Sequence, residues 1–221
     1  MKLRRNDKEP PAPAPPFFFS KFWSVLYGKI RGFAESAGIH MRKSVALNIA
    51  YRLIGSGPVV LVSSLLDKKS ALTPIAWNMP VSDDPPIIAL EIWKGHFVYK
   101  AILQTGDFVV NIPSSDMAET VRKLGSVSGS KVDKFEKYGL TGEPAEKVRS
   151  PRLKSAIGIL ECKLRGDRYL LDKYNIVLGD VVYAEAEKNI FTDRWHPEKK
   201  GRRLLHHLGG KIFYSPARRI I

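Results

Sequence analysis

The hydrophobic pattern from Ser44 onward is that of short β-strands separated by turns. The apolar runs are rich in valine, isoleucine and aromatic residues, and glycine, proline or charged residues bound them, which is typical of strands. Many strands with few helices predict a mainly β fold, an antiparallel barrel that is closed or nearly closed. The expected strands are Val59–Ser63, Ile87–Ile92, Phe108–Ile112, Ile157–Leu164, Ile176–Ala186 and Lys211–Tyr214.

A helical pattern stands between two of these strands. We expect a helix from Met117 to Leu124, with Ser114 or Ser115 before it as its cap and Gly125 at its end. No GxGxxG motif follows a strand, so a nicotinamide cofactor would not be bound in a Rossmann domain.

The first 40 residues differ in character from the rest of the chain. Residues 1–16 are charged and proline-rich, which predicts a disordered or polyproline tail. The segment that follows has the spacing of an amphipathic helix, which Gly28 and Gly32 weaken. Its apolar positions are Phe19, Phe22, Trp23, Leu26, Ile30 and Phe33.

Three interpretations of this leader stay open. Residues 17–33 could contact a membrane surface peripherally, because aromatic and basic residues suit the interface. The helix could instead dock on the barrel or on a partner subunit, which we favour. The natural start could also be Met41. We therefore divide the chain into a leader, residues 1–40, and a domain, residues 41–221; the leader lacks the small-residue cleavage pattern of a signal peptide.

Composition narrows the class of protein. A chain of 221 residues can bury one sizeable core. The single cysteine, Cys162, excludes an intramolecular disulfide and a cysteine-rich metal site, and its apolar run ILECKL predicts a buried, inert thiol. No apolar run approaches the roughly 20 residues that span a bilayer. These features predict a cytoplasmic protein.

The formal charge of +14 raises the question of nucleic-acid binding. The basic residues are scattered, and no helix-turn-helix, RNP-like strand or zinc spacing accompanies them, so we expect no nucleic-acid partner. The five histidines do not stand at metal-ligand spacing with acidic residues, so we expect no metal. A basic surface also favours small anionic ligands, including phosphorylated cofactors.

The segment Ala71–Pro86, ALTPIAWNMPVSDDPP, is the most informative for chemistry. Its prolines fix φ and remove backbone donors, which predicts a stiff loop between two buried strands. A rigid loop that carries both apolar and hydroxyl side chains suits a flat ring with a polar tail.

This segment and the motifs around it resemble the flavin reductase-like family, the FMN-binding split β-barrels. The resemblance covers about residues 45 to 215, and the ordered series of motifs is more specific than any one of them. It implies an antiparallel split β-barrel of Greek-key type with short helices, and a helical segment after His96. The matching segments are Pro58–Ser64, Ala71–Pro86, His96–Ile102, Thr105–Ile112, Asp133–Thr141, Ser155–Leu164, Ile176–Ala186 and Leu204–Tyr214.

The resemblance implies FMN as the cofactor and guides the choice of residues for its ring. Ile75, Ala76 and Trp77 would line the isoalloxazine, with backbone amides of this segment donating to the ring carbonyls and Pro74 stiffening it. Without the resemblance, Trp77 could equally be a core or interface aromatic residue.

The ribityl chain needs hydrogen-bonding groups beside the ring. Thr73, Asn78 and Ser82 can bind its hydroxyls or the ring edge. Asn111, in FVVNI, either touches the flavin or satisfies backbone groups inside the barrel.

For the phosphate we choose His96 and Lys100, with Phe97 packing beside them. The family pattern H-x-T-x-x-N-I has Val98 in place of its threonine and Ala101 in place of its asparagine. Lys100 could compensate for these losses as a point charge.

The function that follows is hydride transfer from NAD(P)H to bound FMN, with delivery of electrons to a small-molecule or redox-protein acceptor. No side chain need act as acid or base, and the family implies a homodimer. The alternative is a non-catalytic FMN-containing electron carrier that a protein partner reduces.

Overall fold

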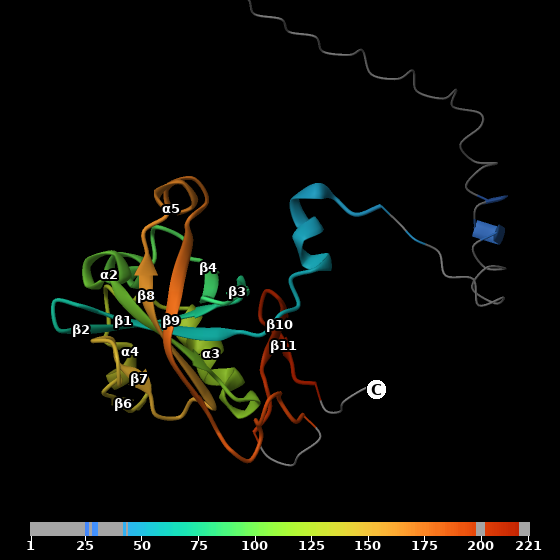
Figure 1. The fold of residues 1–221 in the computed structure, drawn as a ribbon. Coiled ribbons are helices and arrows are strands. Elements are labelled where there is room, and N and C mark those ends of the chain that lie inside the picture. The colour runs from blue at the N-terminus through green and yellow to red at the C-terminus, as the bar shows by residue number, and fades with distance from the viewer. Residues whose placement is uncertain (1–24, 27, 31–41, 43, 198–201, 217–221) are drawn as a thin grey trace, which may run out of the picture. The chain divides into compact units, whose positions relative to one another are not determined.

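Strands dominate the computed structural model of the protein, which describes residues 25–26, 28–30, 42, 44–197 and 202–216 (Figure 1). The chain divides into two units, residues 1–47 and residues 48–221, and each is considered by itself. In the first unit, residues 25, 26 and 28–30 are helical, while most of the predicted amphipathic helix and the proline tail lie outside the described residues. No helix in the described ranges is long and apolar enough to cross a membrane.

The second unit is built on a sheet with the strand order β2-β1-β5-β8-β9-β4-β3, in which all neighbours are antiparallel. Two short sheets, β6-β7 and β10-β11, complete the strands in the described part of the chain. The strands are β1 (Val60–Leu66), β2 (Lys69–Ile75), β3 (Asn78–Asp83), β4 (Pro86–Glu91), β5 (Asp107–Ile112), β6 (Gly142–Glu143), β7 (Arg152–Leu153), β8 (Gly158–Arg165), β9 (Ile176–Ala186), β10 (His206–Gly209) and β11 (Ile212–Tyr214).

Short helices connect and cover these strands. The 3₁₀ segments are η1 (Leu47–Leu53) and η2 (Ser115–Met117), and the α-helices are α2 (Phe97–Thr105), α3 (Ala118–Gly125), α4 (Lys134–Lys137) and α5 (Arg168–Tyr174). The predicted helix at Met117–Leu124 is confirmed as α3, but the predicted serine cap is wrong: Met117 precedes α3, and Ser114, which precedes the 3₁₀ turn leading into it, makes no side-chain capping bond. The predicted helical segment after His96 is confirmed as α2.

The prediction of a loop at Ala71–Pro86 is wrong, because most of this segment forms β2 and β3. Its prolines do not prevent strand pairing, since Pro74 and Pro80 lie in the two strands at the edges of the sheet, where a missing N–H leaves no ladder bond unmade. Only residues 76–77 separate β2 from β3, which stand at opposite edges of the sheet. The sheet must therefore curl until its edges meet at this turn, which makes a split barrel.

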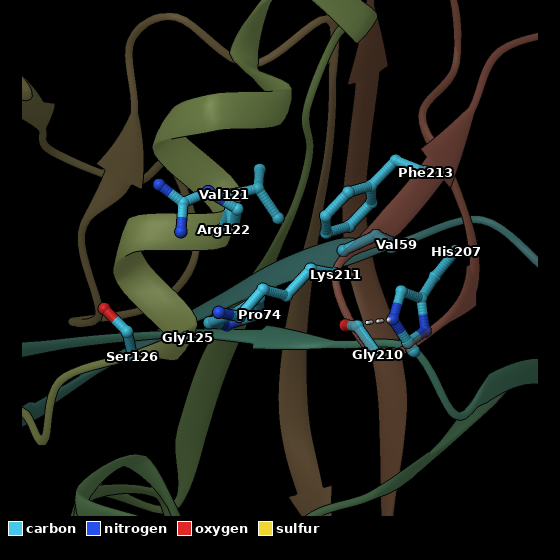
Figure 2. Close-up of a pocket in the computed structure, with 11 residues that line it drawn as sticks. Val59, Pro74, Val121, Arg122, Gly125, Ser126, His207, Gly210, Lys211 and Phe213 are labelled. Atoms are coloured by element: carbon cyan, nitrogen blue, oxygen red, sulfur yellow. Dashed lines mark hydrogen bonds between the residues drawn. The ribbon is translucent and has the colours of Figure 1, made fainter.

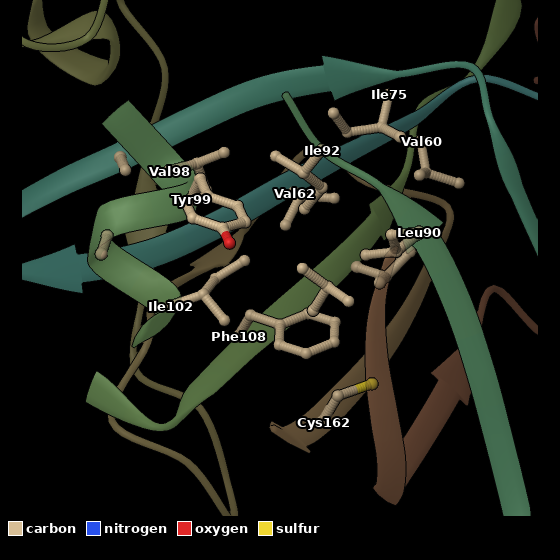
Figure 3. Packing of buried hydrophobic residues seen from close by; sticks show 14 of the residues in the cluster. Val60, Val62, Ile75, Leu90, Ile92, Val98, Tyr99, Ile102, Phe108 and Cys162 are labelled. Atoms are coloured by element: carbon tan, nitrogen blue, oxygen red, sulfur yellow. The ribbon is translucent and has the colours of Figure 1, made fainter. Parts of the chain in front are cut away.

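The barrel interior is filled by apolar side chains from the strands and from one face of α2, where Val98, Tyr99 and Ile102 are buried (Figure 3). Phe108 lies at the centre and is fully buried. Gly179 makes room for it, because a Cβ there would approach Phe108 Cζ to 2.4 Å. A second cluster covers the outer face of β1 and β2, where Leu61 and Leu72 pack against α3.

Cys162 is buried in the barrel interior, as its apolar context predicts. Burial raises the pKa of its thiol far above the ordinary value, so the nucleophilic thiolate is strongly disfavoured.

Candidate functional site

The turn between β2 and β3 presents Trp77 at the surface, with 49% of the residue exposed. Its ring meets the ring of Tyr51 edge to face, with centroids 5.3 Å apart. Asn78 holds the turn, because its side-chain amide donates to the carbonyls of Pro58 (2.9 Å) and Ile75 (3.3 Å). The closure of the barrel therefore fixes the position of the turn that carries the large Trp77 side chain.

An apolar cavity of about 420 Å³ opens beside this turn. Tyr51 and Trp77 supply aromatic walls, and Met79 and Ala89 contribute aliphatic ones. Glu91 also lines the cavity, and burial raises the pKa of its carboxyl group, an effect that a hydrogen bond with Asn175 partly opposes. This combination of flat apolar walls with a few polar groups is characteristic of small-molecule sites.

A second cavity, of about 350 Å³, shares Ala76 with the first (Figure 2). Arg122 lines it from α3 and Ser126 from the residue that follows α3, while Lys211 and Phe213 face it from the β10–β11 hairpin. The Arg122 guanidinium is held by two hydrogen bonds of 2.7 and 2.6 Å to the Glu119 carboxylate. The cavity therefore combines an apolar floor with a cationic rim.

The first turn of α2 forms a third polar region. The Glu91 N–H donates to the Trp77 carbonyl (3.0 Å), so the end of β4 lies beside the β2–β3 turn. Five residues then lead from Glu91 to His96, which precedes α2 with no side-chain capping bond. A chain of five residues spans about 17 Å at most, so the helix N-terminus stands within that distance of Glu91.

Two lysines that the sequence analysis did not select lie at this helix end. Lys134 is buried, and its ammonium group donates to the Leu124 carbonyl at 2.7 Å. Lys69 lies over the Phe97 ring, 5.3 Å from its centroid, and donates to the Ser130 carbonyl. Free N–H groups and the helix dipole already favour an anion at a helix N-terminus, and these cations strengthen that preference.

The pKa values of two cationic groups at this helix end are lowered, mainly by burial. Burial lowers the pKa of the half-buried His96 imidazole, and the charge of Lys134 lowers it further. Burial lowers the pKa of Lys134 from 10.5 to about 8. Both groups thus occupy sites where their own positive charge is disfavoured, and where a bound anion would stabilise it.

The structure brings together only part of the set of residues selected from the sequence. Ala76, Trp77 and Asn78 line the aromatic cavity, and Pro74 lines the cationic one. Lys100 is exposed one turn along α2 from the helix end where His96 and Phe97 lie. Lys100, His96 and Phe97 are not among the residues that line either cavity.

The remaining selected residues have structural surroundings. Thr73 and Ile75 are buried within β2, and Ile75 packs into the barrel interior. Ser82 is half-buried in β3. Asn111 is fully buried; its amide donates to the Leu61 carbonyl, and its oxygen accepts from the Leu153 N–H. The contacts of Asn111 agree with the second of its two interpretations, that it satisfies groups inside the barrel.

One signal in the sequence could have identified Lys134. It lies within DKFEKYGLT, which the sequence analysis matched to the family without assigning it a role. Asp133 begins α4 by accepting from the N–H groups of Phe135 and Glu136, and this fixes the orientation of the helix that carries Lys134. Among the residues that the structure describes, no cluster of histidine, cysteine and acidic side chains could hold a metal ion.

Comparison with known proteins identifies the family. The family described as "Flavin reductase like domain" matches residues 54–209. An uncharacterized protein of Escherichia coli (strain K12), YddH, is 31% identical over 181 residues, which cover 80% of this chain and 95% of that protein. An uncharacterized Archaeoglobus fulgidus protein is 28% identical over 153 residues, covering 69% of this chain and 84% of the relative.

Solved structures share the fold. An FMN-binding domain of a flavin reductases-like enzyme from Shewanella baltica is similar with a TM-score of 0.71 and 25% identity, over 82% of this chain and 99% of that one. Flavoredoxin of Desulfovibrio vulgaris (Miyazaki F) gives a TM-score of 0.70 at 24% identity, over 82% of this chain and 96% of its own. The match over residues 54–209, the relatives matched over most of their length and the split barrel agree: the chain belongs to the flavin reductase-like family.

Proposed function

We propose that this protein is an FMN-dependent oxidoreductase that takes its electrons from NAD(P)H. The observation that carries the proposal is the aromatic cavity at Trp77, whose lining residue Glu91 stands five residues before His96 at the cationic N-terminus of α2. The chemical groups of FMN match these two places in turn, because its flat apolar ring is joined through a hydroxylated chain to a phosphate dianion. The residues present therefore fit the group.

Trp77 would hold the ring, and Asn78 and Glu91 would offer polar groups near its edge. The first turn of α2, near His96, would hold the phosphate, with Lys134 and Lys69 as the nearby cations. This proposal keeps His96 and Phe97 from the set chosen by sequence and assigns the compensating charge to these lysines instead of to Lys100.

When bound, FMN supplies the chemistry by accepting hydride from the nicotinamide and passing electrons to an acceptor. The protein's part is to hold two rings in contact and keep water away from them. The cavity beside Ala76 is our candidate for the nicotinamide nucleotide, because Arg122 and Lys211 can bind its phosphates while Phe213 provides an apolar surface. The electron acceptor would be a small molecule or a redox protein.

We also propose that the protein is a cytoplasmic homodimer. Exposed apolar side chains stand next to the site, at the end of η1 and on the edge strand β3: Leu53 and Ile54 at the first place, Met79 and Val81 at the second. Such a group of side chains favours association with a second copy. Light scattering of the purified protein gives its mass, and the substitution Val81→Lys should shift a dimer toward monomer.

Spectroscopy and one assay test the main proposal. The purified or FMN-reconstituted protein should show flavin absorption, and heat-released chromophore should run as FMN rather than FAD. Under steady-state conditions the holoprotein should oxidise NADH or NADPH with an added flavin or ferric acceptor. A protein that takes up no FMN contradicts the proposal. A protein that holds FMN and oxidises neither nucleotide is instead the electron carrier that a partner reduces.

A further inference from the structure

The cavity beside Ala76 receives positively charged side chains from two separate elements (Figure 2). Arg122 belongs to α3, and Lys211 stands in the turn between β10 and β11. Arg122 has 39% of its side chain accessible to solvent, and Lys211 is exposed. A ligand in this cavity can therefore reach a cation on each of the two elements.

Glu119 holds the Arg122 guanidinium in a fixed orientation. Its carboxylate accepts from Arg122 Nε at 2.7 Å and from Nη2 at 2.6 Å, and Nη1 takes no part in these two bonds. The same carboxylate lies 3.7 Å from the Lys123 ammonium group, so one acidic side chain here faces two basic ones. Because the guanidinium is already ordered, a phosphate that binds at Nη1 costs little further side-chain entropy.

No acidic side chain is among the described residues that line the cavity. This matters for the choice between the two nicotinamide nucleotides, since NADPH carries a phosphate on the 2′-oxygen of its adenosine ribose and NADH has a hydroxyl group there. Binding sites for NAD commonly place a carboxylate that accepts from this hydroxyl, whereas an arginine accommodates the 2′-phosphate. The cavity offers basic groups without such a carboxylate, so its lining favours the nucleotide with the additional phosphate.

We propose that Arg122 and Lys211 make this cavity selective for NADPH over NADH by binding the 2′-phosphate. The inference rests on the proposed function, because it places the nicotinamide nucleotide in this cavity. Phe213 and His207, with ring centroids 5.3 Å apart, supply aromatic surface for a base. The His207 ring is held by a hydrogen bond of 3.1 Å between its Nε2 and the Gly210 carbonyl oxygen (Figure 2).

Adenosine 2′,5′-bisphosphate and adenosine 5′-monophosphate test the proposal as a matched pair, because they differ only in the 2′-phosphate. Isothermal titration calorimetry of the FMN-loaded protein should show the bisphosphate binding about ten- to a hundredfold more tightly. High salt should reduce this difference, since the contacts are charged and accessible to solvent. In steady-state assays the KM for NADPH should lie below that for NADH while kcat stays similar, because the 2′-phosphate is remote from the nicotinamide that gives up hydride.

Substitutions assign the preference to the two cations. Arg122→Gln and Lys211→Gln each remove a charge and should each reduce the preference about tenfold. Arg122→Lys keeps the charge and should retain part of the preference. Arg165 gives the matched control, because it is also a partly exposed arginine paired with a carboxylate, 2.7 Å from Asp180, and it lines neither cavity. Arg165→Gln should leave the preference unchanged.

Several results would overturn the inference. Equal binding of the two adenosine nucleotides by the wild type, binding of neither, or an unchanged preference in both Arg122→Gln and Lys211→Gln contradicts it. An equal loss of preference in Arg165→Gln also contradicts it, because it would show a general attraction of anions to a basic protein. A protein that takes up FMN and prefers NADH keeps the proposed function and loses this inference. A protein that takes up no FMN contradicts the proposed function, and calorimetry of the purified protein then still decides between the two adenosine nucleotides.

Discussion

Replacing Lys134 by methionine separates the requirements of the fold from those of the ligand. Lys134 is 3% exposed, yet it carries a charge that folding must desolvate. Its pKa falls from 10.5 to about 8 on folding. At 1.36 kcal/mol for each pKa unit, keeping it charged at pH 7 costs about 3 kcal/mol of folding free energy.

Methionine fills a similar volume and carries no charge, so Lys134→Met removes this cost. It also removes the hydrogen bond to the Leu124 carbonyl, which offsets about 1 kcal/mol of the gain. We therefore expect the FMN-free variant to be about 1–2 kcal/mol more stable than the wild type at pH 7. Its affinity for FMN should fall about ten- to a hundredfold, because the phosphate loses a desolvated cation.

The pH dependence supplies a second signature. Because folding lowers the pKa of Lys134, the unfolded wild type binds more protons than the folded one between about pH 8 and 10.5. The stability of the wild type therefore rises relative to that of the variant as pH increases through this window, and the variant's advantage should disappear near pH 10. Urea unfolding of the FMN-free proteins at pH 7 and pH 10 measures this difference.

The exposed Lys137 on the same helix gives the matched control, since Lys137→Met should change neither stability nor FMN affinity appreciably. Loss of stability in Lys134→Met that is equal at both pH values would show that the lysine serves the fold alone. Unchanged FMN binding in that variant would remove Lys134 from the phosphate site.

The other predictions concern the phosphate, the barrel centre and the leader. Lys69→Ala should weaken FMN binding severalfold in a fluorescence titration while Lys100→Ala leaves it near the wild-type value; the opposite order would restore Lys100 as the phosphate cation. Gly179→Ala should lower the free energy of unfolding by about 2 kcal/mol or more, since the added Cβ meets Phe108, and unchanged urea midpoints would contradict that packing. A protein beginning at Met41 should fold and bind FMN, and aggregation or loss of flavin would show that the leader belongs to the core.

The strands and helices could be predicted from the sequence where the periodic pattern of hydrophobic residues continued over enough positions to specify them. Ile176–Ala186 has the bounds expected for its strand, and α3 lies within a residue of its expected position. The prediction of a loop at Ala71–Pro86 was wrong because we took its frequent prolines as evidence against strand pairing. A strand tolerates proline when it stands at the edge of a sheet, because it has no neighbour on one side to need the missing N–H. The sheet order decides which strands are edges, and the local sequence does not show it.

The residues of the candidate site were harder to predict from the sequence, for a related reason. Trp77 and Asn78 are adjacent in the chain, so a motif shows them together, and the structure keeps them together. Lys69 and Lys134 approach the start of α2 from distant parts of the chain. Lys134 also owes its lowered pKa to burial, and no local pattern of a short polar helix such as KFEK indicates that one of its two lysines is inside.

The prolines of the two edge strands have a consequence for solubility. A barrel that is split rather than closed leaves two rows of backbone groups with which the strands of another molecule could pair, a common start of aggregation. Pro74 on one margin and Pro80 on the other each remove a donor from such a row. The two edge strands can therefore keep a free side without also inviting uncontrolled strand addition.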